Sequence, residues 1–124
     1  MSKKILIVDD EEDVLIFFNA LFKDNGFDVI EAKNGLEAYK KAKDDKPDLI
    51  TLDITMPEES GVRCYKDLRE NESTKNIPII IVSGVDPEFK KFISSRKNLV
   101  PPTAYFEKPV NGDELVNKIR EILD

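Results

Sequence analysis

Five short apolar runs, separated by longer segments of helical pattern, constrain the fold of this chain more than any other feature. The first run is apolar on both faces, and the fourth is rich in β-branched residues, as expected for strands buried inside a sheet. The runs predict β-strands at Ile5–Val8, Phe27–Ala32, Asp48–Leu52, Ile77–Val82 and Ala104–Phe106.

Helical periodicity and capping residues occupy the segments that follow the strands. The first helix is predicted from apolar residues at helical spacing with Gly26 as a stop signal: Val14, Leu15, Phe18, Leu21 and Phe22. Asn34 with Glu37 forms a capping-box pattern for a second helix through Ala42. A third helix is predicted over 61–69. A fourth is predicted over 86–95, with Asp86 as its N-cap and Pro87 as its first residue. The last helix begins at Asn111, and its inner face carries Leu115, Ile119 and Ile122.

This alternation predicts a (βα)5 architecture. Strands that alternate with helices form a parallel sheet covered by helices on both faces, and right-handed crossovers leave only a few doubly wound arrangements. With 124 residues, the chain is expected to form one domain over residues 1–124. In such α/β sheets, ligands bind beyond the carboxyl ends of the strands.

Composition excludes several function classes. A net charge of −6 argues against direct binding to nucleic acid or to an anionic membrane, and no stretch is long enough to span a bilayer. The chain has no histidine, which excludes the usual zinc sites and every histidine-based triad. Cys64 is the single cysteine, and no signal peptide is evident, so we expect a cytoplasmic protein.

Charged and hydroxyl side chains stand where the predicted strands end. Asp9 and Asp10 follow the first strand, Asp53 the third, Ser83 the fourth, and Lys108 comes shortly after the fifth. Several carboxylates in one cleft repel each other, which either raises the pKa of one of them or calls for a cation, and carboxylate oxygens suit Mg²⁺. With a lysine charge and a serine hydroxyl beside them, these groups could hold a tetrahedral dianion on an aspartate.

Each of these residues also has an ordinary interpretation. Acids after a strand are often solvated loop residues or helix N-caps, and Ser83-Gly84 alone is an ordinary turn. Their joint placement at four strand ends favours a site. A flavin-binding module would need a phosphate loop where the first strand is followed by acids, and an aspartate-dependent phosphohydrolase commonly has a second acid where this chain has Thr55. A nucleoside triphosphatase would need a P-loop, which the chain lacks.

Three motifs resemble the receiver domains of two-component response regulators, including the chemotaxis type. They are Asp-Ile-Thr-Met-Pro at 53–57 with Gly61 eight residues after the aspartate, Ile-Val-Asp-Asp-Glu at 7–11, and Tyr-Phe-Glu-Lys-Pro at 105–109. The similarity covers the whole chain. It implies a flavodoxin-like sandwich whose five-stranded parallel sheet has the order 2-1-3-4-5.

The resemblance also implies roles for individual residues. Asp53 would be the phosphoacceptor, and it would share an Mg²⁺ ion with Asp10, with Asp9 largely through water, and with the Thr55 carbonyl. Lys108 would pair with a phosphoryl oxygen, Ser83 would donate a hydrogen bond to the phosphoryl group, and Tyr105 would be the aromatic switch residue. A static core role is the alternative for Tyr105.

The implied function is that of a phosphoprotein in a phosphorelay. The donor would be a sensor histidine kinase or a phosphotransfer protein, since the chain has no histidine of its own. The output would pass through the face of helix 4, strand 5 and helix 5 to an effector protein or to an output domain missing from this chain. Self-phosphorylation and autodephosphorylation with Mg²⁺ would be its only chemistry, so we expect no conventional enzyme activity. The alternative is a phosphorylation-independent interaction domain, which would be expected to have lost Asp53, Lys108 or the acidic pair.

Two departures from the family pattern bear on these expectations. Ser83 stands where threonine is more frequent, which preserves the hydroxyl. The stretch from Ser83 to Lys108 is a few residues longer than usual, and its segment Ser94–Thr103 contains Pro101-Pro102, which stiffens the chain. The activation site is therefore expected to follow the family more closely than the output face does.

Overall fold

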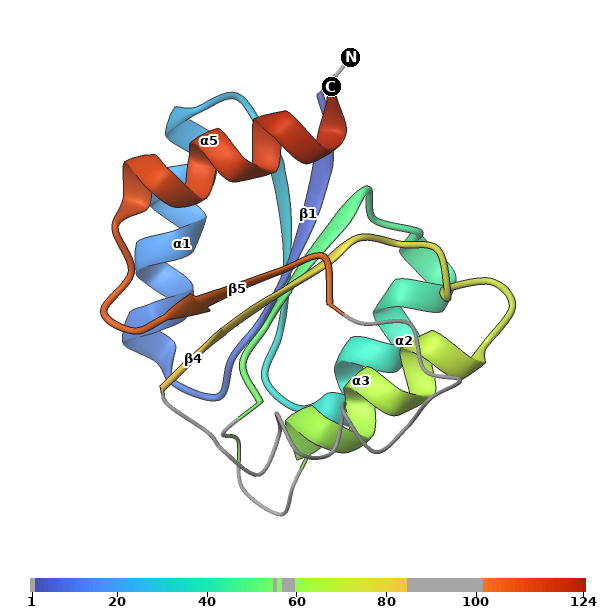
Figure 1. Cartoon of the computed structure of the whole chain (residues 1–124). Coiled ribbons are helices and arrows are strands. Elements are labelled where there is room, and N and C mark those ends of the chain that lie inside the picture. Colours follow the sequence, from blue (N-terminus) through green and yellow to red (C-terminus); the bar gives the residue numbers. More distant parts are fainter. Residues whose placement is uncertain (1, 55, 57–59, 85–101) are drawn as a thin grey trace.

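A computed structural model gives the architecture of the chain (Figure 1). It describes residues 2–54, 56, 60–84 and 102–124, and the predicted helix over 86–95 lies outside them. Five parallel strands form one sheet in the order β2-β1-β3-β4-β5, which confirms the doubly wound fold. The strands are β1 (Lys4–Val8), β2 (Asp28–Ala32), β3 (Leu49–Leu52), β4 (Ile79–Ser83) and β5 (Ala104–Glu107).

The central strands are buried on both faces, which explains why their sequences are continuously apolar. Every residue of β3 and of β4 is buried, whereas β5 at the edge of the sheet is only partly buried. β4 begins after Pro78, because proline has no N–H to give to the ladder, and it continues through Ser83, one residue beyond the predicted end. The Pro78 carbonyl still accepts a bond from Ile50 N at 2.9 Å.

The described helices are α1 (Glu12–Asp24), α2 (Gly35–Asp45), α3 (Ser60–Glu70) and α5 (Gly112–Leu123). Two of them, α2 and α5, begin behind the asparagines that the sequence predicts as caps. Asn34 Oδ1 accepts from Glu37 N at 2.8 Å, and Asn111 Oδ1 accepts from Glu114 N at 3.1 Å, so both predicted caps are confirmed. α1 is followed by Gly26 at φ +89°, a left-handed conformation that glycine adopts without a steric penalty.

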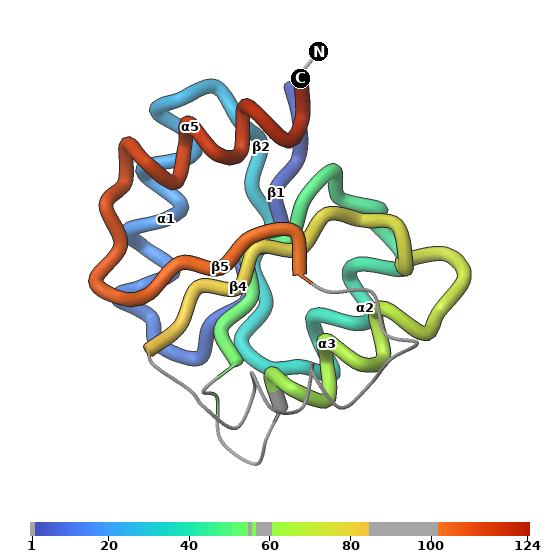
Figure 2. The backbone as a smooth tube through the Cα atoms, viewed as in Figure 1, coloured from blue at the N-terminus to red at the C-terminus, as the bar shows by residue number. Residues whose placement is uncertain are grey.

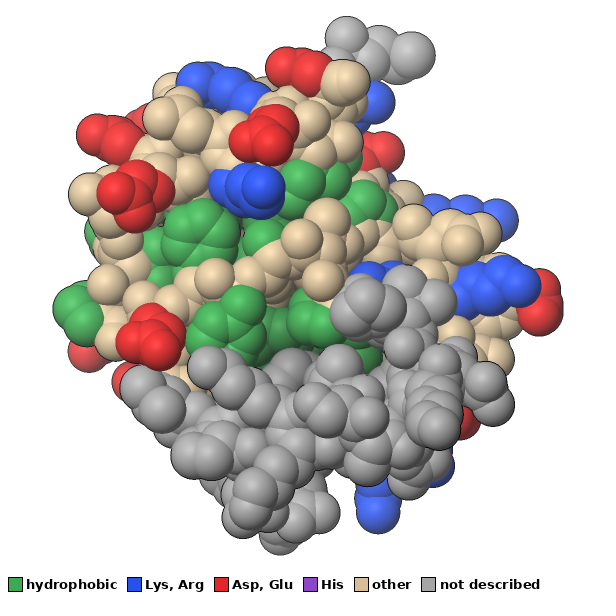
Figure 3. Space-filling model, viewed as in Figure 1, with side chains coloured by type: hydrophobic (Ala, Val, Ile, Leu, Met, Phe, Trp, Pro, Cys, Tyr) green, Lys and Arg blue, Asp and Glu red, His purple; other side chains and the backbone are tan. Residues whose placement is uncertain are grey.

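The sheet separates two apolar cores (Figures 1 and 2). Helices α1 and α5 cover one face, and α2 and α3 cover the other. The first core is built on Ile5, Ile7, Leu15, Phe18, Phe22, Leu49, Ile80, Leu115 and Ile119, and the second on Leu6, Ile50, Leu52, Ile54, Cys64, Tyr65, Leu68, Ile79 and Ile81. Apolar side chains reach the surface between α5 and β5 (Figure 3), in keeping with the partial burial of Ala104 and Phe106.

The strand register brings the carboxyl ends of the strands to one edge. Val8 of β1 pairs with Leu52 of β3, and Ser83 of β4 pairs with Glu107 of β5. The residues that follow these four positions are therefore neighbours in space. Within the described residues, no helix has both the length and the apolar character of a membrane-spanning segment.

Candidate functional site

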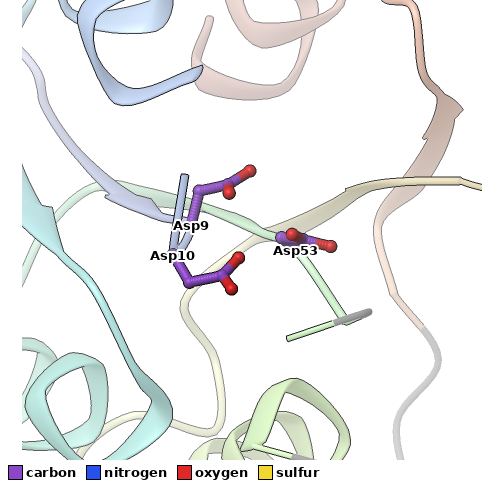
Figure 4. A group of neighbouring side chains, drawn as sticks. All are labelled: Asp9, Asp10 and Asp53. Carbon is purple, nitrogen blue, oxygen red and sulfur yellow. The ribbon is translucent and has the colours of Figure 1, made fainter. Parts of the chain in front are cut away.

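Three carboxylates meet at the carboxyl edge of the sheet. Asp9 and Asp10 follow β1, Asp53 follows β3, and one oxygen of each lies within 4.8 Å of the others. Figure 4 shows the Asp9 and Asp10 side chains extending from the end of β1 on the same side as Asp53. Asp9 and Asp53 are each only 2% exposed, whereas Asp10 is exposed to solvent. The cluster thus has two buried charges and one that faces water.

Main-chain hydrogen bonds hold the two buried aspartates. Asp9 N donates to the Ala32 carbonyl at 3.1 Å, and Asp53 N donates to the Val8 carbonyl at 3.0 Å, so both residues continue the sheet ladder. Asp9 Oδ1 also accepts from Glu11 N at 2.9 Å. The main-chain bonds hold the backbone of both residues, and the bond from Glu11 N orients the Asp9 carboxylate.

Lys108 brings a positive charge to the buried pair. Its Nζ donates to Asp9 Oδ2 at 2.9 Å and to Asp53 Oδ2 at 3.4 Å. Its main-chain N donates to the Ser83 carbonyl at 2.9 Å, and the Lys108–Pro109 peptide bond is cis. Burial alone would lower the pKa of Lys108. The hydrogen bond to Asp9 and the charges of Asp53 and Asp9 outweigh burial and raise the pKa above its ordinary value.

The pKa of Asp9 is raised above its ordinary value. Burial raises the pKa of Asp9, and the charge of Asp53 adds to that effect. The bonds from Lys108 and from Glu11 N act in the opposite direction without cancelling it. Burial is the main cause of this shift, and a cation bound beside Asp9 would favour its charged form.

Ser83 and Tyr105 complete the surroundings of Asp53. Ser83 is fully buried, and its hydroxyl donates to Asp53 Oδ1 at 3.1 Å. Tyr105, one strand away, is partly buried, and its hydroxyl donates to the Gly84 carbonyl at 3.0 Å. The next residue along the chain from Ser83 is thus the one that Tyr105 contacts.

The structure brings together five of the residues singled out in the sequence: Asp9, Asp10, Asp53, Ser83 and Lys108. Tyr105 stands at the border of this group, and Thr55 lies outside the described residues. The carboxylates suit Mg²⁺, which prefers oxygen ligands and retains several waters, and the exposed Asp10 leaves a hydrated side open.

An apolar groove of about 610 Å³ opens beside Lys108, and sequence reasoning did not find it. Phe17 is 50% exposed there, although the neighbouring Phe18 is in the core. The two adjacent phenylalanines were the available signal, because successive helical residues point about 100° apart, so Phe17 lies off the direction in which Phe18 enters the core. The lining comprises Asp13, Val14, Phe17, Phe18, Lys108, Pro109 and Val110.

Known proteins with similar sequences carry response regulator names. Residues 5–120 match the family model described as the response regulator receiver domain. The chain is 37% identical over 123 residues to the alkaline phosphatase synthesis transcriptional regulatory protein PhoP of Bacillus subtilis, covering 99% of this chain and 49% of PhoP. It is 32% identical over 123 residues to the polar-differentiation response regulator DivK of Brucella anthropi, covering 99% of this chain and 98% of DivK. The chain thus spans about half the length of PhoP and nearly all of DivK.

Solved structures of receiver domains have the same fold as this chain. A CheY-like receiver domain protein from Methanospirillum hungatei superposes with a TM-score of 0.87 at 28% identity, covering 100% of this chain and 95% of that one. The chemotaxis protein CheY4 of Vibrio cholerae gives 0.85 at 28% identity, covering 99% and 100%. With the order of its strands and the acidic cluster at their carboxyl ends, this chain belongs to the response regulator receiver domain family of two-component systems.

Proposed function

We propose that this chain receives a phosphoryl group on Asp53 from the phosphohistidine of a sensor histidine kinase or phosphotransfer protein. The observation that carries the proposal is the position of the Asp53 carboxylate. One of its oxygens accepts from the Ser83 hydroxyl and the other from Lys108 Nζ, within a cluster of three carboxylates. A free turn residue would have no such partners.

A carboxylate oxygen of Asp53 attacks the phosphorus, the P–N bond to the donor imidazole breaks, and the imidazole keeps the bonding electron pair and leaves with a proton from water. Negative charge spreads over the equatorial phosphoryl oxygens during the transfer. Lys108, a compact point charge, neutralises part of it, and Ser83 donates a hydrogen bond to it.

The acidic cluster fits a divalent cation. Asp9, Asp10 and Asp53, together with the Thr55 carbonyl that the family resemblance adds, would hold Mg²⁺. When bound, Mg²⁺ supplies positive charge that offsets the charge of the phosphoryl oxygens. The bonds from Asp9 N to the Ala32 carbonyl and from Asp53 N to the Val8 carbonyl hold the main chain from which these two carboxylates extend.

The apolar groove beside Lys108 supports an external donor. A protein that delivers a phosphoryl group to Asp53 must reach the carboxyl edge of the sheet, and the half-exposed Phe17 offers it an apolar contact there. The chain has no histidine that could serve as an internal donor. We propose the cytoplasm as its location, since its partners would be there.

The signal would be the added charge. A phosphoryl group contributes roughly −1.5 to −2 charges and three acceptor oxygens. A move of Ser83 toward it would disturb the neighbouring Gly84, whose carbonyl binds the Tyr105 hydroxyl. We propose that this couples Asp53 to the face of β5, α5 and the predicted helix over 86–95, which would act on an effector protein or an output domain. Self-phosphorylation and autodephosphorylation would be its only catalysis.

Intact mass measurement tests the acceptor. The protein is incubated with Mg²⁺ and acetyl phosphate, and we expect one phosphoryl adduct on the wild type and none on Asp53→Asn. An equal adduct on both proteins, or none on a folded wild type, would contradict the proposal. The second outcome would favour a phosphorylation-independent interaction domain.

A further inference from the structure

Gly61, in the first turn of α3, lies directly against the main chain that carries Asp53. A Cβ atom added to Gly61 would stand 2.4 Å from the Asp53 carbonyl oxygen and 2.4 Å from the Ile54 Cα. Real Cβ atoms essentially never show contacts below 3.0 Å. Both partners are backbone atoms, which cannot turn aside as the end of a flexible side chain can.

Both sides of this contact are held in place. Asp53 N is bonded to the Val8 carbonyl, and Ile54 is buried in the core under α2 and α3. α3 is anchored in the same core by Cys64 and Leu68, which are 1% and 0% exposed. A side chain at position 61 would therefore have to displace the acceptor main chain, the start of α3, or both.

Gly26, Gly84 and Gly112 have no main-chain atom as close as the ones at Gly61. An added Cβ would meet nothing within 4 Å at Gly26 or Gly84. At Gly112, the first residue of α5, it would meet only the side chain of Leu21, at 3.1 Å. The close main-chain approach at Gly61 is thus absent at Gly112, which begins α5.

We propose that Gly61 is a positioning residue for the acceptor, whose missing side chain lets the Asp53 carboxylate stand where it can share a cation with Asp9 and Asp10. This inference rests on the proposed function. Mg²⁺ requires near-ideal octahedral geometry at about 2.0–2.1 Å, whereas Ca²⁺ accepts six to eight oxygens in flexible geometry. A displaced Asp53 should therefore weaken Mg²⁺ binding more than Ca²⁺ binding, which a general loss of packing would not do.

The test compares Gly61→Ala with two control variants. Gly112→Ala adds the same methyl group at another helix start, and Cys64→Ala loosens the packing of α3 without touching Asp53. Calorimetric titration gives the Mg²⁺ and Ca²⁺ affinities, and urea unfolding gives the stability. We expect Gly61→Ala to bind Mg²⁺ about tenfold more weakly, with a smaller loss for Ca²⁺, and both controls to bind as the wild type does.

Wild-type Mg²⁺ affinity in a folded Gly61→Ala would overturn the proposal, as would equal losses for Mg²⁺ and Ca²⁺. If the variant does not fold, an NMR titration of the wild type with Mg²⁺ decides instead. The Gly61 amide should then shift along the same binding curve as the Asp53 and Ile54 amides while Gly112 stays still, and an unmoved Gly61 would overturn the proposal. A wild type that binds Mg²⁺ but takes no phosphoryl group would contradict the proposed function and leave the role of Gly61 standing.

Discussion

Lys108 and Asp9 are 99 residues apart in the chain, yet Lys108 Nζ lies 2.9 Å from Asp9 Oδ2. The same nitrogen lies 3.4 Å from Asp53 Oδ2, so the lysine bridges the ends of β1 and β3. The resemblance to receiver domains implies only that Lys108 pairs with a phosphoryl oxygen. The structure shows that it also holds the two buried carboxylates together.

Removal of the lysine charge should slow phosphorylation while sparing cation binding. Lys108→Met is expected to reduce the rate of adduct formation with acetyl phosphate by about 100-fold, since one preorganised cation is lost from the transition state. Mg²⁺ should bind at least as tightly as to the wild type, because no competing positive charge remains near Asp9. Lys108→Arg is the matched control, which keeps the charge on a larger, planar group. A wild-type rate in Lys108→Met would contradict the role of the lysine.

The raised pKa of Asp9 predicts a pH dependence of stability. Burial, with the charge of Asp53, makes the folded state hold this proton more tightly than the unfolded chain does, whose value is near 3.8. The free energy of unfolding of the metal-free protein should therefore fall as the pH rises from 3.8 through the folded pKa of Asp9. At neutral pH, Asp9→Asn should raise the urea midpoint in the presence of a chelator and also weaken Mg²⁺ binding. The exposed Asp10→Asn is the control, and a larger gain in stability for it would contradict the prediction.

The Ser83 hydroxyl should contribute to phosphorylation independently of its volume. Hydrogen bonds to charged groups are worth about 1.5–3 kcal/mol, so Ser83→Ala is expected to slow adduct formation by roughly 10-fold to 100-fold. Ser83→Thr keeps the hydroxyl but adds a methyl group to a fully buried site, so it should retain most of the rate and lose about 1–3 kcal/mol of stability. Equal rates for the alanine and threonine variants would count against the hydroxyl.

The Cys64 thiol should stay unreactive in the folded protein. Burial, with a smaller effect of the Asp67 charge, raises the pKa of this thiol from 9.0 to about 12. A thiol reagent at pH 8 should label it only as fast as the protein unfolds. Between pH 9 and 12 the unfolded thiol ionises first, so the wild type should lose stability relative to Cys64→Ala by up to about 1.4 kcal/mol per pH unit. Parallel stability curves for the two proteins would refute this.

Much of the fold could be predicted because its signals are local. Asn34 and Asn111 precede their helices with an acid three residues on, and both caps are present in the structure. Strand ends were less accurate. The sequence predicts that β4 ends at Val82, but Ser83 continues the strand, because its place beside Glu107 depends on pairing with β5 and not on its own strand preference.

The long-range contacts of the site could be predicted only in outline. The ends of parallel strands share an edge, so the gathering of Asp9, Asp53, Ser83 and Lys108 followed from topology. The hydrogen bond from Ser83 to Asp53 did not follow, because it depends on a rotamer that distant packing selects. The buried Arg69 was also missed. Its guanidinium donates to the carbonyls of Lys75 and Ile77, which lie across a turn that the sequence pattern did not predict.

The two cores on opposite faces of the sheet have an evolutionary consequence. Gly61 lies against the main chain of Asp53 on the side of the sheet covered by α2 and α3. Phe17 and the groove lie on the side covered by α1 and α5. Since the sheet separates the two cores, a substitution at Phe17 changes no side chain that packs around α3. A duplicated copy of this gene could acquire a new partner by changes around Phe17 while inheriting its acceptor chemistry intact.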